Sequence, residues 1–182
     1  MRKAIITTIV TGLIGLGGVA APMAAFADTP PVGTTTTVGV TGGDLILTAA
    51  SSADFASVAA GQSTAGGSLG TVTVDDQRAG YNGAWTASAV ATDFANSTVP
   101  QAAAIPASDF TYTPGDPSAH SGNATFVTGD GGQMSTDQAV TAYSTSDEIG
   151  VASVSWDPSV SIAVPPDVVA GTYTGTITHS VA

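Results

Sequence analysis

The sequence predicts an all-β protein, a β-sandwich of roughly ten short, mostly antiparallel strands. Beyond residue 27 the chain contains one Glu and no Lys, and Thr, Val, Ser, Gly and Asp dominate. These residues are typical of strands and turns, whereas long helices draw on Glu, Lys, Leu and Gln. Short alternating segments also recur between turn signals at a spacing of ~8–12 residues, which is characteristic of sandwiches.

The N-terminus has the three parts of a secretory signal peptide. Met1-Arg2-Lys3 is basic, residues 4–21 are apolar, and Ala25-Phe26-Ala27 fits the small-x-small cleavage rule. We therefore expect a signal peptide over 1–27, a flexible lead-in over 28–33 and one β-sandwich domain over 34–182. The expected location is extracellular, either secreted or non-covalently attached to the cell wall. No later stretch is apolar for long enough to span a bilayer, so we expect no membrane insertion after signal cleavage.

The charge of the chain limits the partners it can bind, and the absence of cysteine limits how the fold can be stabilised. Arg78 is the only basic residue beyond the signal peptide, whereas all fourteen acidic residues lie beyond it, so the mature formal charge is 1 − 14 = −13. Nucleic acid is excluded as a partner because binding it requires neutralising Lys and Arg. Without cysteine there is no disulfide framework, and stability must come from the core.

The first half of the domain alternates strands with turns rich in Gly, Asn and Asp. A loop is expected over 51–68 and a turn over 75–84. Val72 and Val74 share one face of their strand. Strands are expected over residues 34–41, 44–48, 69–76 and 84–94.

The second half shows the same pattern. Phe110 and Tyr112 share a face of one strand, and a long polar connection around a short strand at 124–128 is expected over 116–132. Further strands are expected at 138–144, 149–157, 159–164 and from 171. In the last of these, apolar and polar positions alternate, which predicts one buried face and a strand that completes the sheet.

One motif suggests catalysis, but it is better explained by structure, and the histidines suggest no metal site. Residues 66–70 match G-x-S-x-G, but a Gly/Ser loop precedes them and a Thr-Val strand follows, which predicts a glycine-rich turn. Neither histidine has metal-ligand spacing, so no zinc site is expected. No base is placed beside a nucleophile, and we predict no catalytic residue.

The histidines and tryptophans have structural interpretations. His120 is expected to be solvated in a loop, and His179 to be a neutral, hydrogen-bonded core residue. Trp85 and Trp156 each lie within a strand. Exposed tryptophans bind sugars, but burial in the core is the preferred interpretation for both.

The aspartates lie at strand ends and in loops, where solvated turn residues are the favoured interpretation. We predict no metal and no cofactor, with calcium the one ion that these hard oxygen ligands would suit. The weak calcium candidates are Asp75, Asp76 and Asp130.

The order of several segments resembles the WxL domain of Gram-positive surface proteins, and the chain looks like a divergent member. The first W-x-L motif would fall at Trp85-Thr86-Ala87, which keeps Trp and loses Leu. The second would fall at His179-Ser180-Val181, which loses Trp. These six residues are the candidate binding residues. The segments that carry the resemblance are TGGDLIL (41–47), LGTVTVDDQRAGYNGAWTASAVATDF (69–94), IPASDFTYTP (105–114) and VPPDVVAGTYTGTIT (164–178).

The resemblance implies an all-β domain that binds peptidoglycan non-covalently and works with companion surface proteins. We therefore expect a non-enzymatic adhesion or binding module for cell-wall glycan or a companion surface protein. A structural subunit that assembles through sheet edges is the alternative. A third option is a carboxylate-based glycan hydrolase, which would require two close Asp side chains in a cleft.

Overall fold

The computed structural model describes residues 35–182, so the predicted signal peptide and lead-in lie outside the described residues. Residues Gly39–Ala182 form one compact unit. The predicted all-β class is confirmed, because the described part contains eleven strands in antiparallel sheets and a single turn of 3-10 helix. None of its helices is long and apolar enough to cross a membrane.

The largest sheet has five strands, in the order β1-β3-β8-β6, with β11 also paired to β3. β1 pairs with the first half of β3 and β11 with the second half, so both lie on the side of β3 opposite β8. The strands are β1 (Leu45–Thr48), β3 (Val72–Ala91), β6 (Pro117–Thr128), β8 (Val140–Trp156) and β11 (Ile177–Val181).

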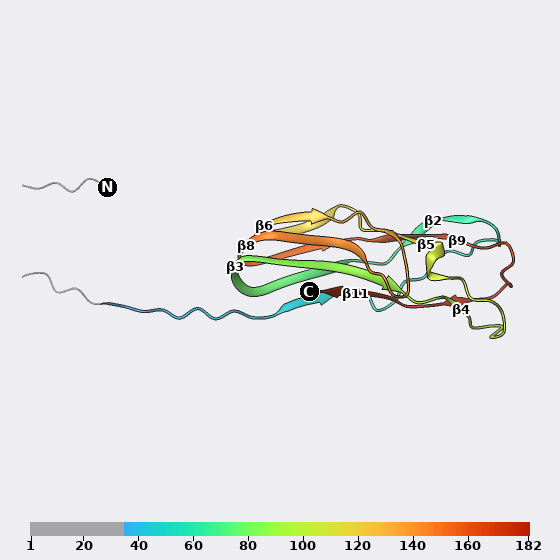
Figure 1. The fold of residues 1–182 in the computed structure, drawn as a ribbon, viewed down its shortest axis with the longest axis horizontal. Helices are drawn as coiled ribbons and strands as arrows, with labels where there is room; N and C mark the ends of the chain where they lie inside the picture. The colour runs from blue at the N-terminus through green and yellow to red at the C-terminus, as the bar shows by residue number, and fades with distance from the viewer. Residues whose placement is uncertain (1–34) are drawn as a thin grey trace, which may run out of the picture. The chain divides into compact units, whose positions relative to one another are not determined.

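The two long strands, β3 and β8, double back while remaining paired (Figure 1). Their register shifts between Asp76 and Gly80, and bulges of this kind bend a strand sharply. Ala79, Asn82 and Asp147 adopt positive φ in the same region. The two halves of one sheet therefore face each other, and the rings of Tyr143 and Trp156 meet across the interior with centroids 4.6 Å apart. We call this bent region, residues 76–85 and 145–150, the corner.

A second sheet continues the sandwich beyond the large one, in the order β2-β9-β5-β7. Its strands are β2 (Ser63–Ser68), β9 (Ser159–Ala163), β5 (Phe110–Thr113) and β7 (Gly132–Gln133). The 3-10 turn η1 (Ala107–Asp109) leads directly into β5. A short ladder joins β4 (Ala95–Asn96) to β10 (Tyr173–Thr174). The rings of Phe94 and Phe110 stack at 4.1 Å.

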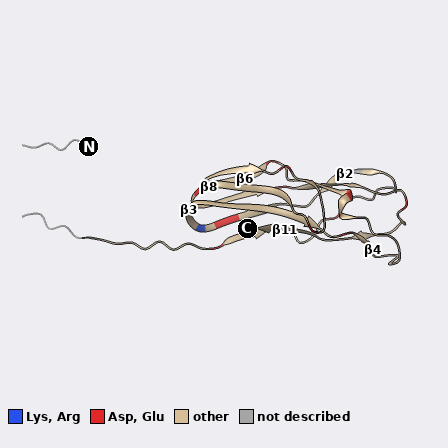
Figure 2. Ribbon diagram, in the orientation of Figure 1, with Lys and Arg blue, Asp and Glu red and all other residues tan. Residues whose placement is uncertain are grey.

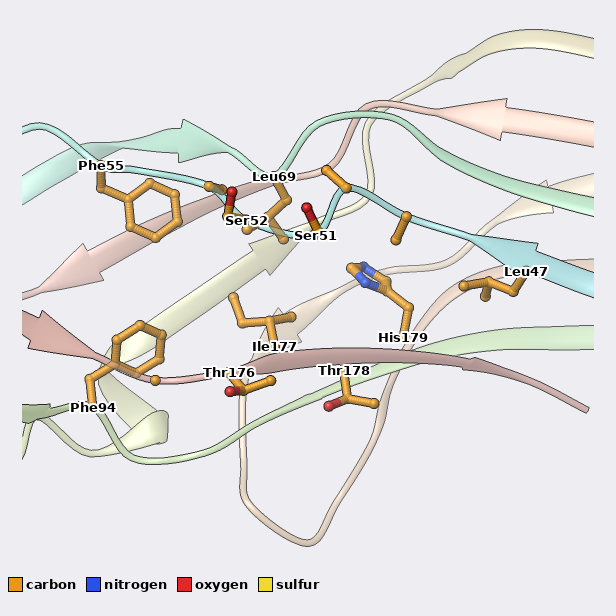
Figure 3. A pocket seen from close by; sticks show the side chains of 14 residues that line it. Leu47, Ser51, Ser52, Phe55, Leu69, Phe94, Thr176, Ile177, Thr178 and His179 are labelled. Carbon is orange, nitrogen blue, oxygen red and sulfur yellow. The ribbon is translucent and has the colours of Figure 1, made fainter.

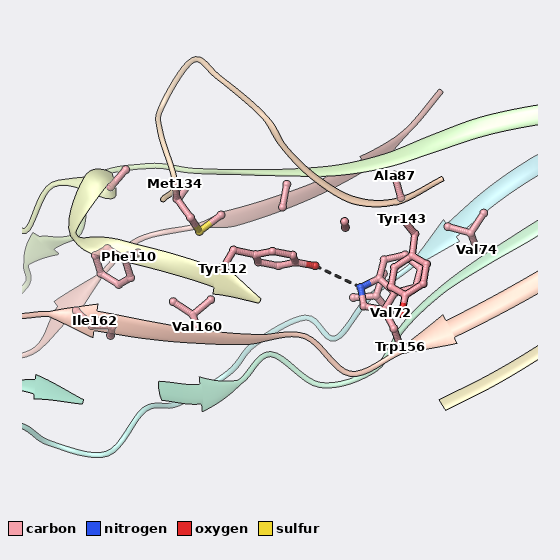
Figure 4. Close-up of a cluster of buried hydrophobic side chains, with 14 of the residues drawn as sticks. Val72, Val74, Ala87, Phe110, Tyr112, Met134, Tyr143, Trp156, Val160 and Ile162 are labelled. Carbon is pink, nitrogen blue, oxygen red and sulfur yellow. Dashed lines mark hydrogen bonds between the residues drawn. The ribbon is translucent and has the colours of Figure 1, made fainter. Parts of the chain in front are cut away.

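The core is aromatic at its centre and lined by small residues (Figure 4). Trp156, Tyr112, Tyr143 and Phe110 are at most 1% exposed. Alanines on the second half of β3 leave the space that these rings occupy. Burying each large side chain stabilises the fold by about 1.5–3 kcal/mol.

The structure confirms several predictions for individual segments. Val72 and Val74 are fully buried on one face of β3, and Phe110 and Tyr112 are buried together on β5. The core interpretation of both tryptophans is correct, with Trp85 3% and Trp156 0% exposed.

Other segment predictions were wrong, mostly because long strands were divided into short ones. Residues 75–84 are not a separate turn, since bulges let β3 bend without leaving the sheet. The predicted strands at 138–144 and 149–157 are one strand, β8. The connection predicted over 116–132 is largely β6, which also places exposed His120 on a strand rather than in a loop.

Two predictions for the first part of the domain, residues 34–41 and 66–70, were also wrong. Residues 35–44 have no regular secondary structure, so the strand predicted over 34–41 is absent where the chain is described. The predicted glycine-rich turn at 66–70 begins inside β2. Gly67 is required there because a Cβ atom would lie 1.9 Å from the Phe55 ring.

Candidate functional site

The two candidate motif positions lie side by side, although they are far apart in sequence. β11 runs antiparallel to the second half of β3, with Val181 opposite Ala87. The Thr86 N–H donates to the Ala182 carbonyl at 2.8 Å, and the Ala182 N–H donates back to the Thr86 carbonyl at 3.1 Å. The hydroxyls of Ser88 and Ser180 are 3.1 Å apart. The fold therefore joins residues 85–87 and 179–181 into one surface.

Only some of the six candidate residues reach solvent. Trp85 and Ala87 face the interior, at 3% and 1% exposed. His179 and Val181 are half-buried, whereas Thr86 and Ser180 are exposed. A ligand on the outer face of β3 and β11 would therefore meet hydroxyl groups and not the Trp85 ring.

His179 is linked to the aromatic core by a chain of hydrogen bonds. The Trp156 Nε1–H donates to Tyr112 Oη at 3.3 Å, and Tyr112 Oη lies 3.1 Å from His179 Nε2. The indole N–H can only donate, so Tyr112 Oη accepts from Trp156. Which partner donates in the bond between Tyr112 and His179 is set by the imidazole tautomer.

Burial keeps the two titratable side chains of this hydrogen-bonded series, Tyr112 and His179, neutral near pH 7. It lowers the pKa of His179 below its usual value of 6.5, because desolvation disfavours the charged imidazolium. Burial also raises the pKa of Tyr112 to about 12. The prediction of a hydrogen-bonded, neutral His179 is confirmed, although the side chain is half-buried rather than fully enclosed.

Beside His179 lies a slot, which is a cavity of about 370 Å³ between β11 and the chain that follows β1 (Figure 3). One wall is Thr176–His179, and the other is Leu47 with residues 49–53. Phe55, Leu69 and Phe94 make it apolar toward the second sheet. His179 is the one titratable side chain that lines this slot, and it bonds Tyr112 rather than a serine hydroxyl.

The corner contains a group of buried polar side chains. Asp76 is 2% exposed and forms a bidentate ion pair with Arg78, whose Nε lies 2.9 and 3.0 Å from the two carboxylate oxygens. Arg78 Nη2 also donates to the Ala84 carbonyl at 3.2 Å, which ties the two halves of β3 together. Figure 2 shows this single basic residue beside acidic positions at the bend.

Glu148 lies in the same corner and is 1% exposed. Neither carboxylate oxygen has a partner at hydrogen-bond distance in the described structure, nor do Trp85 Nε1 and Thr145 Oγ1, although Trp85 and Asp76 both lie near enough to shift the pKa of Glu148. Burial raises the pKa of Glu148, and the Asp76 carboxylate raises it further. The Arg78 hydrogen bonds, in contrast, hold the pKa of Asp76 below 3.8 despite its burial. The two acids therefore titrate in opposite directions from their usual values.

The structure does not gather the weak calcium candidates into one group of ligands. Asp76 is already paired with Arg78, and Asp75, its neighbour on β3, is half-buried opposite Ser153 on β8. Asp130 lies in the loop between β6 and β7. No group of three His, Cys, Asp or Glu side chains in the described part of the chain is arranged to hold a metal ion.

Sequence reasoning missed the corner, although a signal was present. Glu148 and Arg78 are the only Glu and the only basic residue beyond the predicted signal peptide. Chemically unusual residues in a uniform chain are candidates for a specific contact. The slot left no comparable signal, because its walls come from segments more than a hundred residues apart.

Comparison with known proteins found no matching family model, no similar curated protein and no similar solved structure. The residues and their geometry are therefore the basis for any functional assignment. In the described part of the chain they include a hydroxyl-lined outer face, an apolar slot and unpaired strand edges, among them those of β1 and β11.

Proposed function

We propose that this chain is an exported, non-enzymatic binding module that associates non-covalently with the cell surface, where it contacts cell-wall glycan or a companion surface protein. The observation that carries the proposal is the junction of residues 85–87 with 179–181 on adjacent strands beside the slot. Those are the two positions at which the chain resembles the motifs of WxL domains, and each contributes an exposed hydroxyl residue to the same face, Thr86 and Ser180.

The chemistry of this face favours a neutral, hydroxyl-rich partner. Thr86, Ser88, Thr178 and Ser180 present hydroxyl groups from β3 and β11. Such groups exchange hydrogen bonds with sugar hydroxyls and amides. The mature charge of −13 would repel anionic wall polymers, so the glycan strands of peptidoglycan are the better match.

Sedimentation with purified peptidoglycan tests this proposal. The chain lacking residues 1–27 should co-sediment with the glycan, both with and without calcium. Thr86→Asp places a charge on the proposed face and should reduce the sedimented fraction to that of a glycan-free sample. Thr125→Asp adds the same charge on exposed β6 and should leave binding unchanged. Equal binding by all three proteins, or binding by none, would refute the proposed site.

The second candidate function is a structural subunit that assembles through sheet edges. The specific observation is that β1 and β11 each pair with β3 alone among the described residues, so both present an unpaired edge. Natural edge strands usually carry charges or proline that prevent pairing, and neither strand contains any. Concentration-dependent mass in light scattering, without glycan affinity, would favour this function over the first.

A further inference from the structure

We propose that residues 35–41 of one copy form a strand that pairs with the free edge of β11 in a second copy, with Val38 and Val40 entering the slot. This inference rests on the second candidate function, edge assembly, and supplies its missing partner. It is independent of glycan binding.

The donor segment, residues 35–41, has the sequence pattern of a strand but forms no strand in the described chain. Residues 35–41 alternate Thr and Val around Gly39, which is the pattern of a half-buried strand. They take part in no sheet of the described chain. Val38 and Val40 are 86% and 84% exposed. Two β-branched apolar side chains on one face of an unpaired segment indicate a surface that becomes covered elsewhere.

The chain's own β1 is a poor acceptor, because the residues needed for a hairpin are already engaged. The Gly43 N–H donates to the Gln77 carbonyl at 2.6 Å, and the Gln77 N–H donates to the Asp44 carbonyl at 2.9 Å. Gly42 lies so close to Arg78 that a Cβ atom would be 2.1 Å from its carbonyl oxygen. A turn at 42–43 would require both glycines to leave β3. We therefore assign the segment to a second copy.

The acceptor edge is set by the alternation of an antiparallel ladder. Ala182 exchanges both backbone hydrogen bonds with Thr86, and bonded pairs recur at every second residue. Ser180 and Thr178 therefore bond β3, whereas Ile177, His179 and Val181 direct their N–H and C=O groups away from it. These groups form an open edge of five residues.

The slot receives the side chains of such a strand. A strand added to this edge alternates its side chains between the slot and solvent. Val38 and Val40 would meet Leu47, Leu69 and Ile177 in a cavity of about 370 Å³. Residues 35–43 and 177–181 carry no Asp, Glu, Lys or Arg, so this contact avoids the repulsion between two strongly acidic copies.

Substitutions on the donor segment distinguish insertion of Val38 and Val40 into the slot from the effect of added negative charge alone. The self-association of the chain lacking residues 1–27 is measured by sedimentation equilibrium. The double substitution Val38→Asp/Val40→Asp should raise the Kd by about tenfold or more, because it places two charges in an apolar slot. Thr37→Asp/Thr41→Asp adds the same charge on the outward face and should have a much smaller effect.

Substitutions at the acceptor edge test the same contact from the other side. His179→Pro removes an N–H that points away from β3, and so blocks the added strand while sparing the existing ladder. His179→Ala loses the same bond to Tyr112 and keeps that N–H, which makes it the matched control. Both variants lose the imidazole that lines the slot, so association should be much weaker in the proline variant than in the alanine variant, and equal association in the two would contradict the edge pairing.

Amide hydrogen exchange identifies the segments that pair. Residues 35–41 and the edge amides of β11 should become protected together, and only at concentrations where the mass increases. Protection of 35–41 in dilute monomer would overturn the inference, since the segment would then fold onto its own chain. Self-association that survives Val38→Asp/Val40→Asp would overturn it too, but leave edge assembly standing. No self-association at any concentration would refute both.

Discussion

The aromatic core and the corner both include inward-facing residues of β3 and β8, and the core also includes residues of β5, yet the two regions satisfy their polar atoms differently. In the core, the Trp156 indole donates to Tyr112, and the Tyr143 hydroxyl donates to the Gly115 carbonyl at 2.7 Å. In the corner, Trp85 Nε1 and the Glu148 carboxylate have no such partners. Two inward-facing tryptophans in one sheet are therefore in opposite situations.

This difference indicates separate roles for the two regions. A buried polar atom with its hydrogen bond made is close to neutral in cost, whereas an unpartnered one costs about 1–3 kcal/mol. The core supplies stability through burial of satisfied aromatic rings. In the corner, the unpartnered polar atoms lower the stability where the sheet bends. One ion pair and its hydrogen bond connect the two halves of β3 there.

The largest effect is expected in the core. Trp156→Ala removes a fully buried ring and leaves a cavity against Tyr143 and Tyr112, so it should lower the free energy of unfolding by about 3–5 kcal/mol. Urea denaturation followed by tryptophan fluorescence and circular dichroism measures this loss. Tyr81→Ala removes a ring that is 80% exposed and should change stability by less than about 0.5 kcal/mol. Similar losses in both variants would remove the core from its assigned role.

The next effect concerns the corner ion pair. Arg78→Met keeps most of the side-chain stem but leaves Asp76 buried without its counter-ion. We expect a loss of about 2 kcal/mol at pH 7, less than for a fully buried pair because Arg78 is 41% exposed. The loss should shrink below pH 4, where protonation of Asp76 in the variant removes the unpaired charge. A penalty independent of pH would show that Arg78 acts through packing alone.

A matched pair of conservative substitutions compares the tryptophans directly. Trp156→Phe removes a donor that Tyr112 accepts, and should cost about 1 kcal/mol more than the change in ring size alone. Trp85→Phe removes an N–H with no partner at hydrogen-bond distance, which keeps only a weaker interaction with the Glu148 carboxylate, so the same substitution should cost less there. Thermal unfolding of both variants gives the difference, and equal losses would contradict the assignment of Trp85 Nε1 as unsatisfied.

The smallest effect is a change in how the free energy of unfolding depends on pH. The pKa of Glu148 is raised in the folded state, so the folded chain holds a proton that the unfolded chain releases near pH 4.5. Stability from this group is therefore present below pH 4.5 and is lost as the pH rises through the folded pKa. Asp76 acts oppositely, because its stabilisation is lost as the pH falls below 3.8.

Glu148→Gln should abolish the loss of stability as the pH rises above 4.5, and leave the loss of stability at low pH unchanged. Denaturation midpoints collected between pH 3 and pH 8 for wild type and variant provide the comparison. Parallel curves for the two proteins would show that the pKa of Glu148 is the same in the folded and unfolded chain.

The sequence predicted the β class and the inward faces well, because both depend on local alternation. Val72, Val74, Phe110 and Tyr112 were correctly placed for this reason. The bend of β3 was beyond such reasoning, since Gly, Asn and Asp between 75 and 84 indicate a turn whether or not the strands stay paired through it. That choice depends on β8, which bends at the matching position.

The candidate site was predictable in its residues and not in its geometry. Trp85, Thr86 and His179 were singled out separately, but no local pattern places β11 beside β3. Alternation also predicted a strand over 34–41, and there the pattern is sound while a partner strand is absent from the described chain. Strand propensity is realised only when another edge is available.

The pairing of β11 with β3 joins two segments that lie far apart in the sequence. Ser88 and Ser180 are ninety-two positions apart, and closing a long loop costs conformational entropy. The slot and the junction of residues 85–87 with 179–181 therefore exist only when the C-terminal strand has paired with β3. A chain that has not finished folding lacks its proposed ligand surface altogether, so binding would report completion of the fold.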